Sequence, residues 1–116
     1  GVEFFQTQYA FDENILKNYM LKLNELHITD KAYFIIGLGV IKSAKSARWM
    51  NKNLFGINIP EEIINRIEQS DDERNEGIKI CTELIEKYKS IEGVSGIHLM
   101  GYKQEKEIAS VISNFN

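Results

Sequence analysis

Short apolar runs alternate with longer segments of helical periodicity along this chain, and that alternation predicts an α/β protein. The runs lie near residues 4–8, 33–38 and 96–100, and strands separated by helices in this way usually pair in parallel through crossover connections. The first run has no helix before it. We therefore expect the last three βα units of a (β/α)8 TIM-like barrel, with covering helices.

Three parallel strands on their own would leave two open sheet edges, which are a liability in an isolated protein. The chain is therefore either the closing arc of a larger barrel or a small three-layer sheet that dimerises. We favour the barrel, because the first strand starts without a lead-in helix. Residues 1–116 then form the C-terminal portion of such a barrel, with no internal domain boundary. The second run is apolar at nearly every position, which is typical of a strand buried on both faces.

Each helix has a start signal in the sequence. Asp12 and Ser43 are good N-caps, Pro60 suits a first helical turn, and Asp71 or Asp72 begins the next helix. The second helix should end near residue 53. Apolar side chains at helical spacing are expected to face the core; they are Ile15, Leu16, Tyr19, Met20, Leu23, Leu26, Ala44, Ala47, Met50, Ile63, Ile64, Ile67, Ile78, Cys81, Leu84, Ile85, Tyr88, Ile108, Val111, Ile112 and Phe115.

Composition narrows the classes of protein to consider. The 116 residues are 43% hydrophobic and 27% charged, with a net charge of −3 and interspersed acids and bases. This gives no electrostatic footprint for nucleic acid or an anionic membrane, so neither is expected as a partner. The longest apolar run, residues 32–41, is far shorter than a bilayer span. The single cysteine, Cys81, excludes an internal disulfide and suits a reducing cytoplasm.

The first candidate site lies at the end of the first strand. Strand alternation would point Gln6 and Gln8 to one face and Thr7 to the other. A planar amide offers two donors and an acceptor, so it can pair with the edge of a heterocycle such as a pterin. The alternative is a strand-end glutamine that satisfies loop backbone groups, and composition alone favours that alternative.

The second candidate site follows the second strand. Gly37 and Gly39 begin like a dinucleotide-binding fingerprint, but Lys42 stands where the third glycine should be. A dinucleotide-binding fold is therefore not expected. The glycines let the backbone approach a flat ligand, or simply turn the chain. Lys42, Lys45 and Arg48 either attract a phosphate or carboxylate to the helix start or form a solvated basic face.

The third candidate site ends the last strand. His98 lies within an apolar run, and a buried ring of this kind needs a hydrogen-bonding partner. A hydrogen-bonded core histidine is a commoner outcome than a catalytic base. Tyr102, just past the strand, is better placed to touch a ligand. The sequence has no metal-ligand spacing, nucleophile elbow or phosphate-cradling loop.

Five short segments, in this order and spacing, resemble the C-terminal part of the methylenetetrahydrofolate reductase family. They are residues 7–12 (TQYAFD), Gly37 followed by residues 43–48 (SAKSAR), residues 59–62 (IPEE), residues 76–78 (EGI) and residues 96–99 (GIHL). The likeness spans essentially the whole chain. Two positions depart from the family pattern, because Ile36 and Val40 stand where the family often has proline.

The resemblance implies a flavin-dependent (β/α)8 barrel of one-carbon metabolism that reduces 5,10-methylenetetrahydrofolate to 5-methyltetrahydrofolate, with NADH or NADPH as hydride source. It implies that Gln8 binds the folate pterin and that Ser46 and Met50 line the place where folate and nicotinamide take turns. It also implies that Tyr102 contacts folate and that Gln6 lies beside the flavin. The family's acidic residue and most FAD contacts would lie outside this chain, so we expect no catalytic residue here and an inactive isolated chain.

Two other interpretations stay open. The isolated chain can be a non-catalytic fragment or interaction module that self-associates through its open sheet edges, and we expect a homo-oligomer. Alternatively, it belongs to a related barrel that has lost the chemistry or uses another carrier, such as a modified pterin.

Overall fold

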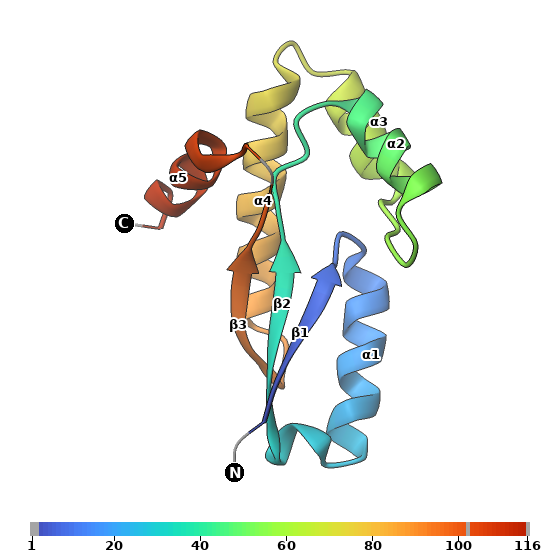
Figure 1. Ribbon diagram of the computed structural model, residues 1–116, viewed down its shortest axis with the longest axis vertical. Coiled ribbons are helices and arrows are strands. Elements are labelled where there is room, and N and C mark those ends of the chain that lie inside the picture. The colour runs from blue at the N-terminus through green and yellow to red at the C-terminus, as the bar shows by residue number, and fades with distance from the viewer. Residues whose placement is uncertain (1–2, 102, 116) are drawn as a thin grey trace.

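The computed structural model describes residues 3–101 and 103–115, and its centre is a parallel sheet (Figure 1). The strands β1 (Glu3–Tyr9), β2 (Ala32–Leu38) and β3 (Val94–Leu99) lie side by side in chain order. Both strand pairs are parallel. The three predicted strands are therefore confirmed, to within two residues at each end.

Helices follow each strand, as predicted. Their bounds are α1 (Glu13–Glu25), the short 3-10 helix η1 (Ile28–Asp30), α2 (Ala44–Asn53), α3 (Glu61–Glu68), α4 (Glu73–Lys89) and α5 (Glu105–Ser113). The side chains of Asp12, Ser43 and Asp72 each accept a hydrogen bond from backbone N–H groups in the first turn of α1, α2 and α4. These contacts satisfy donors that a helix start otherwise leaves unpaired, and they confirm the predicted starts.

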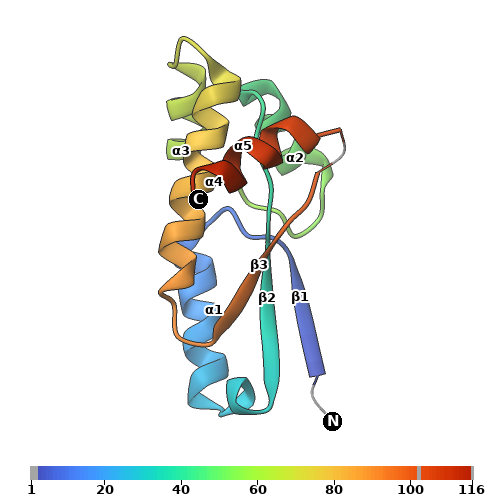
Figure 2. The same cartoon turned by 90° about the vertical axis from the view of Figure 1, so that its left-hand side faces the viewer.

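The helices α1 and α4 cover one face of the sheet, and no described helix covers the opposite face (Figure 2). On β2, Phe34, Ile36 and Leu38 are buried on the helix side, whereas Tyr33 is exposed. Burial of β2 on both faces is thus confirmed only in part. Consecutive parallel strands with helices on a single side are the arrangement of a (β/α)8 barrel wall, whereas a three-layer sheet has helices on both sides.

The long helix α4 fixes the layer behind the sheet. The five side chains that helical spacing predicted are all buried, and so is Ile80, which was not predicted; the five are Ile78, Cys81, Leu84, Ile85 and Tyr88. The Tyr88 hydroxyl also donates a hydrogen bond to the carbonyl oxygen of Ala10, at 2.5 Å, and so links the helix to the chain leaving β1.

Some predicted core positions of α1 and α5 are exposed instead. Leu16, Met20 and Val111 are buried, but Ile15, Tyr19, Leu26 and Ile112 are exposed. The reason is the place of each helix: α1 covers the edge strand β1 and α5 lies beside the opposite edge (Figure 1). Each helix therefore has a neighbour on only one side among the described residues.

The expectation of a core histidine at position 98 is wrong, because His98 is exposed. His98 pairs with Gly37 of β2, and alternation from the buried Ile36 and Leu38 places Gly37 on the face that the helices leave uncovered.

Candidate functional site

The carboxyl ends of the three strands meet at one end of the sheet, where the loops after β1 and β2 and the segment after β3 begin. Two hydrogen bonds continue the pairing past the strands: Ala10 N–H donates to Gly37 O at 3.0 Å, and Met100 N–H donates to Leu38 O at 2.8 Å. These two hydrogen bonds fix the positions of the three strand ends relative to one another. In barrel folds this is the edge from which ligand-binding side chains project.

An irregularity in β1 lies between Gln6 and Tyr9 and so includes Thr7 and Gln8. Gln6 pairs with Ile35 and Tyr9 pairs with Gly37, so β1 takes three steps where β2 takes two. This is a β-bulge, which re-aims the side chains beside it. The extra residue breaks the predicted alternation, and position 8 is no longer tied to the face of Gln6.

The hydroxyl of Thr7 holds this bulge together. Its oxygen accepts a hydrogen bond from the Gly37 N–H at 2.9 Å, and its proton is donated to the carbonyl of Gln8 at 2.8 Å. Gly37 has no side chain at the point where one would collide with the Thr7 carbonyl and the Met100 methyl group. The absence of a side chain at Gly37 therefore permits the close approach of β1 and of the segment after β3.

Gln6 and Gln8 both line a cavity of about 320 Å³ beside β1, a volume at the lower end of the range for small-molecule sites. Aromatic and aliphatic residues make most of its wall. The aromatic residues are Phe5, Tyr9, Phe11, Tyr19 and Phe34. The rings of Tyr9 and Phe11 stack with centroids 5.3 Å apart. The cavity thus has a mainly apolar wall, and Gln6 and Gln8 are among the residues that line it.

The two amides differ in their surroundings. Gln6 Nε2 lies 3.6 Å from the Met100 sulfur, across β2 from its own strand. Gln8 is exposed, and its amide has no hydrogen-bonding partner among residues 3–101 and 103–115. The alternative in which Gln8 satisfies loop backbone is therefore not what the described residues show.

Asp12 and Asn58 close one end of the cavity. Asp12 Oδ1 caps α1 by accepting hydrogen bonds from the N–H groups of Asn14 and Ile15, at 3.0 and 3.1 Å. Its other oxygen accepts a hydrogen bond from Asn58 Nδ2 at 3.0 Å, which ties the segment between α2 and α3 to the start of α1. Both carboxylate oxygens are thus engaged within the protein.

Ser46 and Met50 lie one turn apart on α2, but neither lines the cavity beside Gln8. The Ser46 hydroxyl donates to the Ser43 carbonyl at 2.9 Å within the helix cap. Met50 is half-buried against the core. Tyr102 lies outside the described residues. The structure therefore brings Gln6 and Gln8 to one cavity and leaves Ser46 and Met50 apart from it.

The basic residues around the start of α2 largely have partners within the chain. Arg48 contacts Glu68 at 2.6 Å, and Lys42 contacts Glu107 at 3.5 Å. The Ala44 N–H, at the helix start, donates to the Glu73 carboxylate at 2.8 Å. A carboxylate does occupy this helix N-terminus, as the anion hypothesis required, but it comes from α4 of the same chain.

Metal binding and thiol chemistry find little support in this structure. Among the described residues, no group of three or more histidine, cysteine, aspartate or glutamate side chains is arranged to hold a metal ion. Burial raises the pKa of the Cys81 thiol to about 12, so the thiol stays neutral and unreactive at ordinary pH. The described helices are also all too short or too polar to cross a membrane.

Several contacts at this end of the sheet were not predicted. Gln104 and Glu107 of the α5 region contact the loop after β2, and Thr7 bridges two strands. In the sequence, Gln104 and Glu107 look like ordinary polar residues at a helix start. Only the nearly complete burial of Glu107 sets it apart, and burial is not visible in a single sequence.

A three-stranded parallel sheet with helices on one face is consistent with part of a TIM-barrel-like α/β domain, and a cavity lined by Gln6 and Gln8 lies beside its edge strand β1. The family model for methylenetetrahydrofolate reductase matches residues 1–116. The chain therefore belongs to the methylenetetrahydrofolate reductase family, which is an oxidoreductase family of one-carbon metabolism and generally depends on flavin. A comparison with curated proteins found no match.

Proposed function

We propose that this chain is the folate-binding part of a flavin-dependent reductase. The intact protein would reduce 5,10-methylenetetrahydrofolate to 5-methyltetrahydrofolate, with NADH or NADPH as hydride source. The observation behind this proposal is the family match over the whole chain together with the free amide of Gln8 at the cavity beside β1. The isolated chain would be inactive, because the acidic residue of the family and most of the flavin contacts would lie outside it.

Gln8 is the residue that we propose orients the folate. Its side chain is exposed and offers two donors and an acceptor in one plane, which complements the amide-like edge of a pterin. The aromatic rings that line the cavity provide flat apolar surface for the pterin faces. We further propose that Ser46, Met50 and Tyr102 line the neighbouring exchange site for folate and nicotinamide.

A flavin would find one polar contact in this chain. Gln6 is exposed and lies against the Met100 thioether, and a planar amide next to an adaptable sulfur suits the edge of a flat heterocycle. We therefore propose that Gln6 contacts the FAD and that the other contacts come from outside this chain. When bound, FAD would carry the hydride between nicotinamide and folate.

We propose that residues 1–116 form a continuous part of a (β/α)8 barrel, comprising its last three βα units. The sequential strand order and the one-sided helical cover support this. An apolar cavity lies on the helix side of the edge strand β3, at Ile97 and Leu99. A further βα unit would fill it. A location in the cytoplasm is also proposed, supported by the single reduced cysteine.

The test is an assay of the natural full-length protein. We expect it to bind flavin, seen as visible absorbance, and to oxidise a nicotinamide when 5,10-methylenetetrahydrofolate is supplied. A correctly folded but colourless protein with no such activity would contradict the proposal.

A second candidate is a non-catalytic module that self-associates. Phe4 and Tyr33 stack on the uncovered face with ring centroids 5.1 Å apart, and both are exposed. This aromatic pair would favour a homo-oligomer of the isolated chain. Light scattering after size exclusion tests this directly, and a strict monomer at high concentration would reject it.

A further inference from the structure

The side chain of Gln104, just before α5, pairs with the backbone of Val40 in the loop after β2. The Val40 N–H donates to Gln104 Oε1 at 3.2 Å, and Gln104 Nε2 donates to the Val40 carbonyl at 2.8 Å. One planar amide thus satisfies both backbone groups of a single residue, as a neighbouring strand would. The two residues are separated by 64 positions, so the pairing joins distant segments.

Two glycines make room for this pairing. A side chain at Gly101 would overlap Gln104, and one at Gly39 would lie 2.5 Å from the Met100 carbonyl oxygen. Neither glycine has the positive φ that would explain it by backbone conformation. Both segments, the one at Gly39 and the one at Gly101, thus lack a side chain where the Gln104 amide lies between them.

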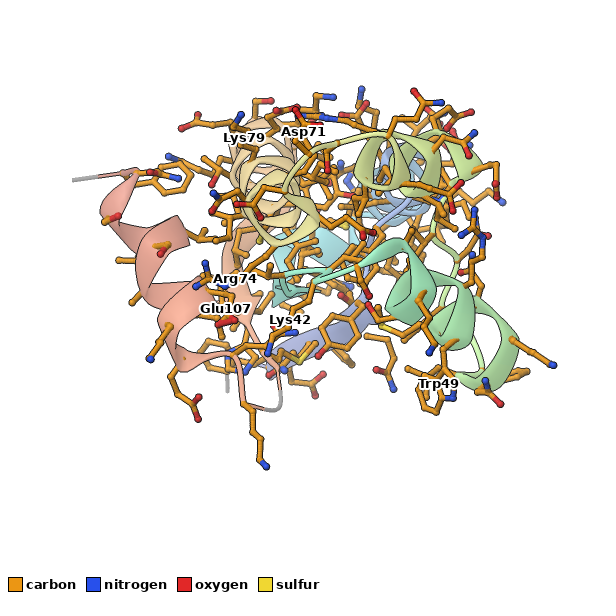
Figure 3. All side chains as sticks on the ribbon, turned by 90° about the horizontal axis from the view of Figure 1, so that it is seen from above. Lys42, Trp49, Asp71, Arg74, Lys79 and Glu107 are labelled. Carbon is orange, nitrogen blue, oxygen red and sulfur yellow. The ribbon has the colours of Figure 1, made fainter. Side chains whose placement is uncertain are left out.

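One turn further along, Glu107 adds a charged contact to the same loop. Glu107 is only 7% exposed, and its carboxylate lies 3.2 Å from Arg74 of α4 and 3.5 Å from Lys42. Figure 3 shows Glu107 beside Arg74, with Lys42 nearby, where α5 passes the loop. Lys42 also donates to the Lys103 carbonyl at 2.9 Å. A carboxylate this buried is stable only when it is paired.

The helix α4 holds the same loop from the other side. Gly77 leaves no room for a side chain, because one there would overlap the Ile41 carbonyl oxygen. The Glu73 carboxylate accepts the Ala44 N–H at the start of α2. Val40, Ile41, Lys42 and Ala44 are therefore contacted by α4 or by the α5 region, and these contacts set the direction in which α2 leaves the sheet.

We propose that Gln104 and Glu107 are positioning residues, which fix the loop of residues 39–43 and with it the helix α2 that bears Ser46 and Met50. The further claim that this serves folate and nicotinamide binding rests on the proposed function. Neither residue touches the cavity beside Gln8, so their effect on ligands passes through the loop and α2.

The test compares Gln104→Ala with Lys106→Ala in the natural full-length protein. Lys106 is exposed on α5, so its replacement controls for a change on the same helix. In Gln104→Ala we expect amide hydrogen exchange at Val40 to accelerate on the order of tenfold or more, while exchange at Ile36 stays as in the parent. Unchanged exchange at Val40 would overturn the proposal, whether or not the protein has reductase activity.

A conservative variant, Gln104→Glu, separates the two hydrogen bonds. The introduced carboxylate can accept from the Val40 N–H but cannot donate to the Val40 carbonyl until it is protonated. In Gln104→Glu, the protection of the Val40 amide against hydrogen exchange is compared with that in the parent at the same pH. This protection should therefore recover as pH falls toward the pKa of the introduced carboxyl. A merely bulky side chain at this position would show no such pH dependence, and that result would overturn the role of the amide.

The link to function has its own readout. In an active parent, Gln104→Ala should raise the KM for folate and for nicotinamide on the order of tenfold, with unchanged flavin content. Faster exchange at Val40 with both KM values unchanged would overturn the functional claim. An inactive parent with normal flavin content would contradict the proposed function instead, and the exchange measurement would still decide the positioning role.

Discussion

The hydroxyl of Thr7 accepts the backbone N–H of Gly37 at 2.9 Å and so replaces a main-chain group in the ladder between β1 and β2. The same hydroxyl donates to the Gln8 carbonyl at 2.8 Å. A side-chain hydroxyl thus links the two strands where β1 bulges, at Thr7 and Gln8. The candidate ligand-binding amide owes its position to its neighbour in the sequence.

Replacing Thr7 with valine should therefore destabilise the protein. Valine matches the shape of threonine but leaves the Gly37 N–H without a partner, and a buried unsatisfied donor costs about 1–3 kcal/mol. Thr7→Ser keeps the hydroxyl and serves as the matched control. In urea unfolding, the parent and Thr7→Ser should have similar free energies of unfolding, and that of Thr7→Val should be clearly lower. Equal stability of the serine and valine variants would show that the hydroxyl is not needed.

For the substitution Gly77→Ala, helix propensity and packing predict opposite effects on stability. Alanine in place of a mid-helix glycine normally stabilises by about 1 kcal/mol. Here the added methyl group would overlap the Ile41 carbonyl oxygen, so Gly77→Ala should instead lower the free energy of unfolding by more than that gain. Lys79→Ala, on the exposed side of the same helix, is the control. A more stable Gly77→Ala would mean that α4 does not press against the loop after β2.

Arg66 joins α3 to α4 through ion pairs. These pairs make the stability of the fold depend on pH with a definite sign. Arg66 contacts Glu76 at 2.6 Å and Glu83 at 2.7 Å, and the hydrogen bond from Arg66 lowers the pKa of Glu83. A carboxyl whose pKa is lower in the folded state stabilises above its unfolded pKa, near 4.3, and loses that contribution as pH falls through the folded value.

The stability difference between the parent and Glu83→Gln should therefore be present at neutral pH and vanish in acid. Because the pair is largely exposed, solvent screening limits the difference to at most about 1 kcal/mol. Unfolding measured across the acid range tests this, with Glu86→Gln as an exposed control on the same helix. A difference that grows as pH falls would contradict the assignment.

Local signals in the sequence predicted much of this fold. Asp12, Ser43 and Asp72 each cap a helix through contacts within three residues, so a short window contains the whole interaction. The buried stripe of α4 is also a property of one helix and its spacing. Such features are visible before any partner is known.

Features that depend on distant partners were missed. The bulge beside Thr7 exists only because of the register against β2. The buried Glu107 needs Arg74 and Lys42, which come from two other segments. The exposure of His98 reflects a sheet face that no described helix covers. None of these long-range relationships leaves a periodic or local pattern in the sequence.

The central claim, that Gln8 orients the folate, is tested most directly by Gln8→Ala in the natural full-length protein. Gln69→Ala, an exposed glutamine at the end of α3, is the control. Loss of the amide would leave polar groups of the pterin unpaired, so the KM for 5,10-methylenetetrahydrofolate should rise about 10- to 100-fold. Nicotinamide oxidation by a soluble quinone acceptor should not change. An unaltered folate KM, or an equal loss in both reactions, would contradict the account.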